Sequence, residues 1–392
     1  MNIVLFEDQD YRKHLKPLTL TRPIGMLRVG IHTIKEKWER RMQAQVSFVT
    51  ADYLQQKFVR QELEMNLYVN SSFLPCKTLI DLIQNLKPGQ YIVSGTEYVA
   101  YYAESQKTDE ELSQVSEIIE LEAFDVRTIK HLPDLFLNNG AEIEEDFDYL
   151  TKGRKSEKLD DPHCVIYNPD RVFIEKGVKA RMSTINAENG PVYIGENAIL
   201  QEGSVVIGPA AICEEAMVAY GAKIRHNTTL GPVCRVGGEV GNSIFHAYSN
   251  KAHDGFLGNS YIGEWCNLGA NTNNSNLKND YSPVKLFDYL SGDLWNTGEL
   301  FCGTFMGDFT KAGISTMFNT GTVVGVSSNV FGAGFQAKFI PSFSWGGAAE
   351  GYESYRLEKA IQVINATMGR RDMQLSDIDL EILQTIFKNR RA

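Results

Sequence analysis

Aliphatic residues recur at every sixth position along the middle of the chain. The series runs unbroken through Ile194, Leu200, Val206, Ile212, Val218, Ile224, Leu230 and Val236. The residue four places after each of them is nearly always small: Ala198, Ser204, Ala210, Ala216, Ala222, Thr228, Cys234 and Val240. The pattern resumes at Met306, Ala312, Phe318, Val324 and Val330. A period of six matches neither the 3.6 of an α-helix nor the alternation of a simple strand.

A hexapeptide period with one aliphatic and one small inward residue predicts a β-solenoid. Three short strands would form each triangular coil, with the aliphatic residue in the core and the small residue at the tight corner. Glycines at 307, 313, 325, 332 and 334 would let either a corner or a ligand approach the backbone closely.

The segments on either side of the repeat have different periods. Before residue 150, strand-like stretches such as NIVLF (2–6) and VSFVT (46–50) alternate with helix-like ones such as 31–42, which favours a parallel, covered sheet. Residues 151–163 are polar and predict a linker. Beyond Gly347, residues 355–371 and 376–391 have helical spacing, and Ser376 followed by Asp379 is typical of a helix start. We therefore expect domains at 1–160, 161–350 and 351–392.

Composition and charge argue against a membrane protein, a secreted protein and a nucleic-acid-binding protein. The 392 residues contain no apolar run of bilayer length, and the N-terminus lacks the features of a secretion signal, so a cytoplasmic protein is expected. The net charge of −10 argues against nucleic acid as a partner, but not against an anionic small substrate. Six cysteines without paired spacing indicate thiols; Cys213, Cys234 and Cys266 fall in the repeat and should be buried.

The repeat is interrupted by SNKAHDGFLGNSYIGEWCNLGANT (249–272). This stretch resembles the acetyltransferase half of the bifunctional enzyme family that makes UDP-N-acetylglucosamine, whose motif is S-K-x-x-H-x-x-Y-L-G-[DN]-x-x-I-G-x-x-x-N-x-G-A-G-T. The shared residues, in order, are Ser249, His253, Leu257, Gly258, Ile262, Gly263, Asn267, Gly269, Ala270 and Thr272. LTLTRPIGMLRVGI and SNLKNDYSPVK extend the resemblance to a shortened bacterial variant of that family.

The resemblance implies a fold and a chemistry. The fold would be a Rossmann-like α/β nucleotidyltransferase-like domain, a left-handed parallel β-helix of hexapeptide repeats, and C-terminal helices. Acetyl-CoA would acetylate an amino-sugar phosphate in a homotrimer with active sites between adjacent β-helices. His253 matches the family's catalytic base, and histidine titrates in the range that removing a proton from an amine requires.

The resemblance also implies roles for other positions. Asn267 would contact the acetyl or sugar group, and Glu239 would orient the site. Lys285 or Arg235 would bind the sugar phosphate, for which a guanidinium has suitable geometry. Phe256 stands where the family has a substrate-contacting tyrosine, and Gly241 stands where it has a lysine, so the substrate pocket should differ in shape or specificity.

The N-terminal half departs further from the family. A nucleotidyltransferase would have a G-x-G-T-R phosphate loop after its first strand, but the chain reads EDQDYRKHLKPLTLTRP there. Arg12, Lys13, Arg22 and Arg28, with Lys16, are candidates to neutralise a triphosphate. The family's Mg²⁺-binding aspartate is replaced by Asn70 and Ser71, which leaves Glu7 and Asp8 as candidate carboxylates and the metal ligands unknown.

The resemblance thus implies N-acetylation of glucosamine 1-phosphate in the β-helix, with uridylyl transfer from UTP in the N-terminal half. Two alternatives remain. One is a sugar-phosphate nucleotidyltransferase of other specificity, such as thymidylyl, in which the β-helix is a scaffold. The other is a non-catalytic oligomeric ligand-binding protein.

Overall fold

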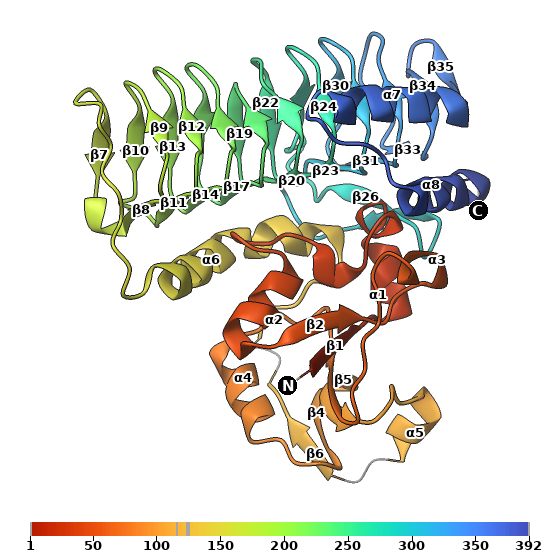
Figure 1. Ribbon diagram of the computed structural model, residues 1–392. Helices are drawn as coiled ribbons and strands as arrows, with labels where there is room; N and C mark the ends of the chain where they lie inside the picture. Colours follow the sequence, from red (N-terminus) through yellow and green to blue (C-terminus); the bar gives the residue numbers. More distant parts are fainter. Residues whose placement is uncertain (1, 115–116, 123–125, 391–392) are drawn as a thin grey trace.

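The computed structural model describes residues 2–114, 117–122 and 126–390, which form an α/β domain lying along a β-helix (Figure 1). The α/β domain, here called the N-terminal domain, ends with a long helix that runs beside the β-helix. The chain then enters the β-helix at its far end and returns past the domain, so the C-terminal helices lie next to residues near the N-terminus.

The sheet of the N-terminal domain has six strands in the order β2-β1-β3-β5-β4-β6. They are β1 (Asn2–Phe6), β2 (Gln45–Phe48), β3 (Asn66–Asn70), β4 (Gln90–Ser94), β5 (Glu97–Ala103) and β6 (Glu117–Glu120). The predicted parallel pairing is right for β1 with β2 and β3, and wrong for β5, which is antiparallel to both β3 and β4. Gly95, at φ +61°, provides the tight reversal between β4 and β5 that two adjacent strands require.

Helices cover this sheet. They are α1 (Gln9–His14), α2 (Ile34–Met42), α3 (Asp52–Gln55), α4 (Lys77–Gln84), α5 (Asp109–Ser113) and α6 (Leu132–Thr151), with short 3₁₀ turns at Leu18–Leu20 and Ile24–Met26. Thr33 and Glu36 form a capping box that fixes the start of α2. No bilayer-crossing helix occurs among the described residues; even α6, with 20 residues, carries several carboxylates.

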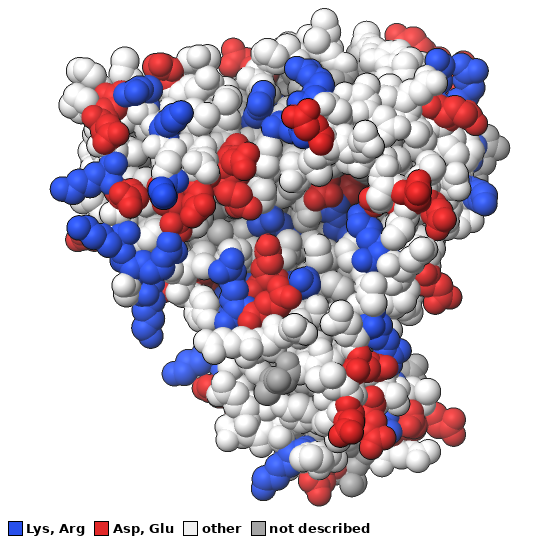
Figure 2. All heavy atoms as spheres, in the orientation of Figure 1, with Lys and Arg blue, Asp and Glu red and all other residues white. Residues whose placement is uncertain are grey.

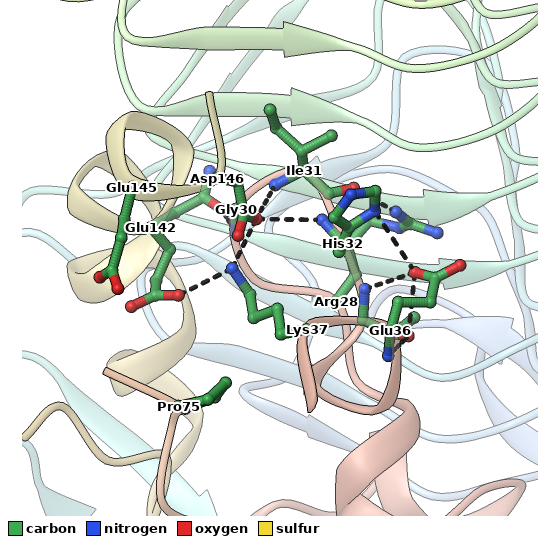
Figure 3. A network of polar contacts seen from close by, with 12 residues as sticks. Arg28, Gly30, Ile31, His32, Glu36, Lys37, Pro75, Glu142, Glu145 and Asp146 are labelled. Atoms are coloured by element: carbon green, nitrogen blue, oxygen red, sulfur yellow. Dashed lines mark hydrogen bonds and ion pairs between the residues drawn. The ribbon is translucent and has the colours of Figure 1, made fainter. Parts of the chain in front are cut away.

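A buried charge network holds α2 against α6 (Figure 3). The Lys37 ammonium is fully buried between the carboxylates of Glu142, at 2.7 Å, and Asp146. Asp146 also accepts hydrogen bonds from the backbone N–H of Ile31 and pairs with Arg41. Removing one partner would leave a buried charge uncompensated, so this network fixes the orientation of α6.

The β-helix has three faces, to which its coils contribute short strands; these run parallel to one another except the last strand of face three, which is antiparallel to its neighbour. Face one comprises β7 (Val165–Tyr167), β10 (Thr184–Asn186), β13 (Val205–Ile207), β16 (Lys223–Ile224), β19 (Glu239–Gly241) and β22 (Phe256–Gly258), continued by the pair β25 (Asn273–Asn274) and β30 (Met317–Phe318). Face two comprises β8 (Val172–Ile174), β11 (Val192–Ile194), β14 (Ala210–Ile212), β17 (Thr228–Leu230), β20 (Ile244–Ala247), β23 (Tyr261–Glu264), β28 (Thr304–Met306), β31 (Thr322–Val324) and β33 (Phe339–Ile340). Face three comprises β9 (Lys179–Ala180), β12 (Ile199–Leu200), β15 (Met217–Val218), β18 (Arg235–Val236), β21 (Asn250–Lys251), β24 (Asn267–Leu268), β29 (Lys311–Ala312), β32 (Asn329–Val330), β34 (Ser344–Gly347) and β35 (Gly351–Ser354).

The hexapeptide prediction is confirmed. The aliphatic positions from Ile194 to Val236 are buried, as are their small partners from Ala198 to Val240, and the aliphatic positions form one continuous core. Cys213, Cys234 and Cys266 are buried thiols, as expected. Tyr261 pairs with Phe305 of the next coil because the chain between β25 and β28 leaves the coil and forms the antiparallel hairpin β26 (Lys285–Asp288) and β27 (Asp293–Asn296).

The N-terminal domain lies against face two. Helix α6 contacts β14, β17 and β20, and the ring of Phe136 stacks on that of Phe305. Ile244, Tyr261 and Val323 of face two belong to the same apolar core as β1 and β3. Face two is therefore covered by the chain itself.

The last two helices close one corner of the β-helix. Helices α7 (Leu357–Gly369) and α8 (Asp377–Asn389) pack with Trp265, Val326 and Phe343, at the corner between faces two and three, and with Leu54 of α3. Ser376 caps α8 by accepting a hydrogen bond from the N–H of Asp379, as predicted. On the surface in view, acidic and basic side chains are interspersed over both halves (Figure 2).

Candidate functional site

His253 lies at the corner between faces three and one, in the turn from β21 to β22. Its side chain is exposed. Because N-terminal-domain residues cover face two, this corner is on the opposite side of the β-helix from the domain. The histidine predicted as a base is thus presented on a part of the prism that the described chain leaves open.

A buried lysine holds the histidine turn. Lys251 occupies an inward position, paired in register with Val236, and only 1% of its surface is exposed. Its ammonium donates to the carbonyl oxygens of Gly237 at 3.2 Å, His253 at 3.1 Å and Gly255 at 2.7 Å. Burial lowers the pKa of Lys251 to about 8. Sequence analysis missed this residue, although a lysine at a position that should be aliphatic was the available signal.

The turn is also fixed from the following coil. Gly255 has φ +124°, and a Cβ there would lie 2.1 Å from the carbonyl oxygen of Thr272, so only glycine fits. The backbone N–H of Phe256 donates to the side-chain oxygen of Asn273 at 2.8 Å. The His253 backbone is consequently held at both ends, and its exposed imidazole extends from a fixed turn.

Two of the predicted partners lie on face one beside this corner. Glu239 and Phe256 are cross-strand neighbours in adjacent coils. The Glu239 carboxylate pairs with Arg225 at 3.0 Å, a contact that sequence analysis did not foresee. Phe256 has its ring close to Gly258, so its partly buried side chain shapes the surface next to the turn.

Two others lie on face three. Arg235, Asn250 and Asn267 follow one another in register on successive coils, and Lys311 continues the ladder. The side chains of Arg235 and Asn267 are exposed. Burial lowers the pKa of Lys311 to about 8, which makes it a second cation that sequence analysis missed.

Lys285 is placed differently. It is exposed on β26, in the hairpin that leaves the coil, and β26 contacts β31 of face two. The structure therefore brings Glu239, Phe256, Arg235 and Asn267 to the two faces that meet at the His253 corner, but does not bring Lys285 of the same chain to that corner.

His246 cannot replace His253. It is buried, with Nδ1 2.8 Å from the Tyr261 hydroxyl. Burial, followed by the charges of Arg22 and Arg28, keeps its pKa well below the ordinary histidine range. A neutral, enclosed imidazole of this kind is a packing residue.

At the carboxyl end of β1, the chain's own side chains occupy the place of a phosphate loop. The Glu7 carboxylate is buried, 3.1 Å from Arg12, 2.5 Å from the Thr50 hydroxyl and 2.5 Å from the backbone N of Ile24. The Asp8 carboxylate caps α1 by accepting from the backbone N–H groups of residues 10 and 11. The Asp8 carboxylate thus already binds N–H groups at the start of α1 that would otherwise be free to bind a phosphate.

The expectation that Arg12, Arg22 and Arg28 face a triphosphate does not agree with the structure. All three are buried. Arg12 is held by Glu7; Arg22 forms ion pairs with Asp308 and with Glu264 at 3.1 Å; Arg28 donates to the carbonyl oxygens of His246 and Ile31. Arg22 and Arg28 join the two halves of the chain. Of the five predicted cations, only Lys16 and Lys13, which is paired with exposed Asp10, are partly open to solvent.

The carboxylates suggested for Mg²⁺ do not fit a metal either. Glu7 and Asp8 are engaged as described, and the Asn70 side-chain oxygen accepts from the backbone N of Ser72. Among residues 2–114, 117–122 and 126–390, no cluster of three His, Cys, Asp or Glu residues could hold an ion.

The carboxyl edge of the same sheet carries a cation that sequence analysis missed. The Lys130 ammonium is 2.6 Å from the Glu97 carboxylate and lies over the ring of Tyr11. Beside it, the β26–β27 hairpin docks on the domain: the Trp295 ring stacks on that of His131, with centroids 4.7 Å apart. Open α/β sheets bind ligands outside the carboxyl ends of the strands, at the point where the strand order reverses. In the order β2-β1-β3, this reversal lies at β1 and β3.

Comparison with known proteins bears out the resemblance. Residues 3–155 match the model of the sugar nucleotidyl transferase family. The chain is 34% identical over 158 residues to the bifunctional protein GlmU of Methanococcus maripaludis, covering 40% of this chain and 38% of that protein. It is 39% identical over 87 residues to GlmU of Methanocaldococcus jannaschii, covering 22% and 21%.

The chain therefore spans less than half the length of the curated relatives it matches. Among solved structures, a UDP-N-acetylglucosamine acyltransferase of Arabidopsis aligns at 14% identity with a TM-score of 0.33, over 54% of this chain and 76% of that one. Residues 3–155 thus match a sugar nucleotidyl transferase domain, and the chain is similar over part of its length to the bifunctional GlmU proteins.

Proposed function

We propose that the β-helix transfers the acetyl group of acetyl-CoA to the amine of glucosamine 1-phosphate. The observation that carries this proposal is the exposed His253 in the family motif, on a turn fixed by buried Lys251. The similarity to GlmU proteins supports the choice of substrate.

In this reaction the neutral amine attacks the thioester carbonyl carbon and a C–N bond forms. His253 accepts the proton that the nitrogen must lose, and the C–S bond breaks to release CoA, which leaves as the thiol after taking a proton. Lys251 and Gly255 hold the histidine backbone, so the imidazole needs little reorganisation. The Asn267 amide would donate to the acetyl or sugar oxygen, Arg235 would bind the sugar phosphate, and Glu239 with Arg225 would orient the site.

We further propose a homotrimer in the cytoplasm, with acetyl-CoA along the coils of residues 306–335 and Lys285 reaching the phosphate from a neighbouring subunit. Face two and one corner are covered by the chain itself, whereas the His253 corner is open. A second β-helix at that corner would enclose the site and could provide the hydroxyl that Phe256 lacks.

For the N-terminal domain we propose uridylyl transfer from UTP to the acetylated sugar phosphate, giving UDP-N-acetylglucosamine and pyrophosphate. The family match over residues 3–155 supports this. Lys130 and Glu97, at the carboxyl edge of the sheet, are its candidate binding residues. Pyrophosphate release from UTP, measured with and without Mg²⁺ and against thymidine triphosphate, tests both the activity and its nucleotide.

The acetyltransferase proposal is tested by following free thiol from acetyl-CoA with glucosamine 1-phosphate. His253→Ala should reduce kcat by about 10²-fold or more, as expected for loss of a general base. His226→Ala is the matched control, because His226 is also exposed in the β-helix and should retain full activity. Equal rates for the wild type and His253→Ala would refute the base. A wild type inert with every amino-sugar phosphate would favour the scaffold alternatives.

A further inference from the structure

The β26–β27 hairpin leaves the β-helix and turns one of its two faces toward the N-terminal domain. Leu286 lies opposite Trp295 in this antiparallel pair, so the two side chains share a face. Asp288, two residues after Leu286, lies on the same face. Leu286 is buried in the apolar core of the N-terminal domain. The hairpin therefore presents Trp295 to the domain and not to solvent alone.

Two contacts hold the hairpin in this position. The Asp288 carboxylate lies 2.7 Å from Nδ1 of His14, at the end of α1. The ring of His131, immediately before α6, contacts the rings of His14 and Trp295, with centroids 4.5 Å and 4.7 Å away. The His131 and Trp295 planes are only 17° apart, so these two rings stack. Trp295 is thus fixed both by its strand and by its neighbouring ring.

This stack leaves part of the Trp295 ring open. Trp295 is 37% exposed, and His131 provides its one ring contact among the described residues. Trp38 and Trp265, by contrast, are buried. An indole that is already held in place loses little conformational freedom when a ligand binds, and it offers a planar group a surface on which to stack.

The open ring lies next to the carboxyl edge of the N-terminal sheet. His131 directly follows Lys130, whose ammonium lies 2.6 Å from the Glu97 carboxylate at the start of β5. The same ammonium is 5.1 Å from the ring centroid of Tyr11 and 5.5 Å from that of Phe73, which follows β3. Open α/β sheets bind their ligands outside this edge. A ligand bound there would reach the exposed part of the indole.

We propose that Trp295 is the stacking surface for the base of the nucleoside triphosphate that the N-terminal domain binds. A nucleoside triphosphate carries a planar base, and bases of every kind stack on aromatic side chains. The β-helix thus completes the nucleotide site of the other half of the chain through its hairpin. This inference rests on the proposed uridylyl transfer and deepens it, because it places the uracil ring of UTP.

The test follows the intrinsic tryptophan fluorescence of the full chain as UTP is added, because a base stacked on an indole quenches its emission. Affinity is measured in parallel by isothermal titration calorimetry. Trp295→Leu removes the stacking surface, and Trp295→Tyr keeps an aromatic ring. Trp345→Leu is the matched control, since Trp345 is 39% exposed but lies on face three of the β-helix. Inorganic triphosphate and N-acetylglucosamine 1-phosphate, each alone, are the comparison probes.

UTP should quench the fluorescence of the wild type and of Trp345→Leu, but not that of Trp295→Leu. Trp295→Leu should bind UTP about tenfold or more weakly and inorganic triphosphate as tightly as the wild type, whereas Trp295→Tyr should stay within about threefold of the wild type for UTP.

Unchanged UTP binding by Trp295→Leu would overturn the proposal, as would equal losses in the Leu and Tyr variants or a wild type that does not bind UTP. Quenching by N-acetylglucosamine 1-phosphate and not by UTP would assign the ring to the sugar, and would also overturn it. Pyrophosphate release reports on the proposed activity separately. UTP that quenches Trp295 but is not cleaved would refute uridylyl transfer and leave the stacking surface in place.

Discussion

Because Lys251 is buried, the free energy of unfolding should rise with pH. Its pKa is lowered from 10.5 to about 8 in the folded chain because its ammonium is buried. Between these values the unfolded chain binds a proton that the folded chain has released, so raising the pH favours folding. From pH 7.5 to 9.5 this adds about 2 kcal/mol to the free energy of unfolding, relative to a chain without the lysine. Lys251→Met should therefore remove that increment.

The assay is urea denaturation followed by circular dichroism at both pH values, for wild type, Lys251→Met and Lys223→Met. Lys223 is exposed on β16, so its removal changes the net charge equally without changing a buried ammonium. Other groups that titrate in this range contribute to all three proteins and cancel in the comparison. If wild type and Lys251→Met show the same change with pH, the lysine does not release its proton in the fold and the reasoning is wrong.

Three further substitutions test the packing. Asp308→Asn leaves buried Arg22 short of a counter-charge and should lower the free energy of unfolding by about 3–5 kcal/mol, measured by thermal denaturation. Leu230→Ala, in the fully buried series, should cost about 2–5 kcal/mol in urea; no change would argue against a close-packed prism. Gly255→Ala places a Cβ 2.1 Å from the Thr272 oxygen and should destabilise by more than about 1 kcal/mol, which differential scanning fluorimetry would detect.

The β-helix could be predicted from sequence because its order is local. The aliphatic residues from Ile194 to Val236 occupy equivalent positions in the repeat and share one core. Their spacing in the sequence therefore identifies the core residues directly. The motif that interrupts the repeat also singled out His253, and the structure adds that its side chain is exposed. Whether Glu239, Asn267 and Arg235 act on a substrate stays a prediction.

The contacts between the two halves could not be predicted. Arg22 pairs with Asp308, which lies 286 residues later in the chain, and no local pattern distinguishes a buried arginine from one that faces solvent. The cations that follow the first strand suggested a phosphate site. In the structure, Arg12 instead pairs with a carboxylate and Arg28 donates to backbone carbonyl oxygens. The antiparallel β5 was missed for a similar reason: pairing direction is set by the two-residue turn at Gly95 and not by strand composition.

The opposite placement of the His253 corner and the N-terminal domain has a kinetic consequence. The close-packed core of the β-helix lies between that corner and the carboxyl edge of the N-terminal sheet. Within one chain, a sugar phosphate acetylated at the corner would therefore have no enclosed path to that edge. It would leave into bulk water and be recaptured by diffusion. Unlabelled intermediate added to the medium should then dilute a radioactive label fully before it reaches the final product, as it would with two unlinked enzymes.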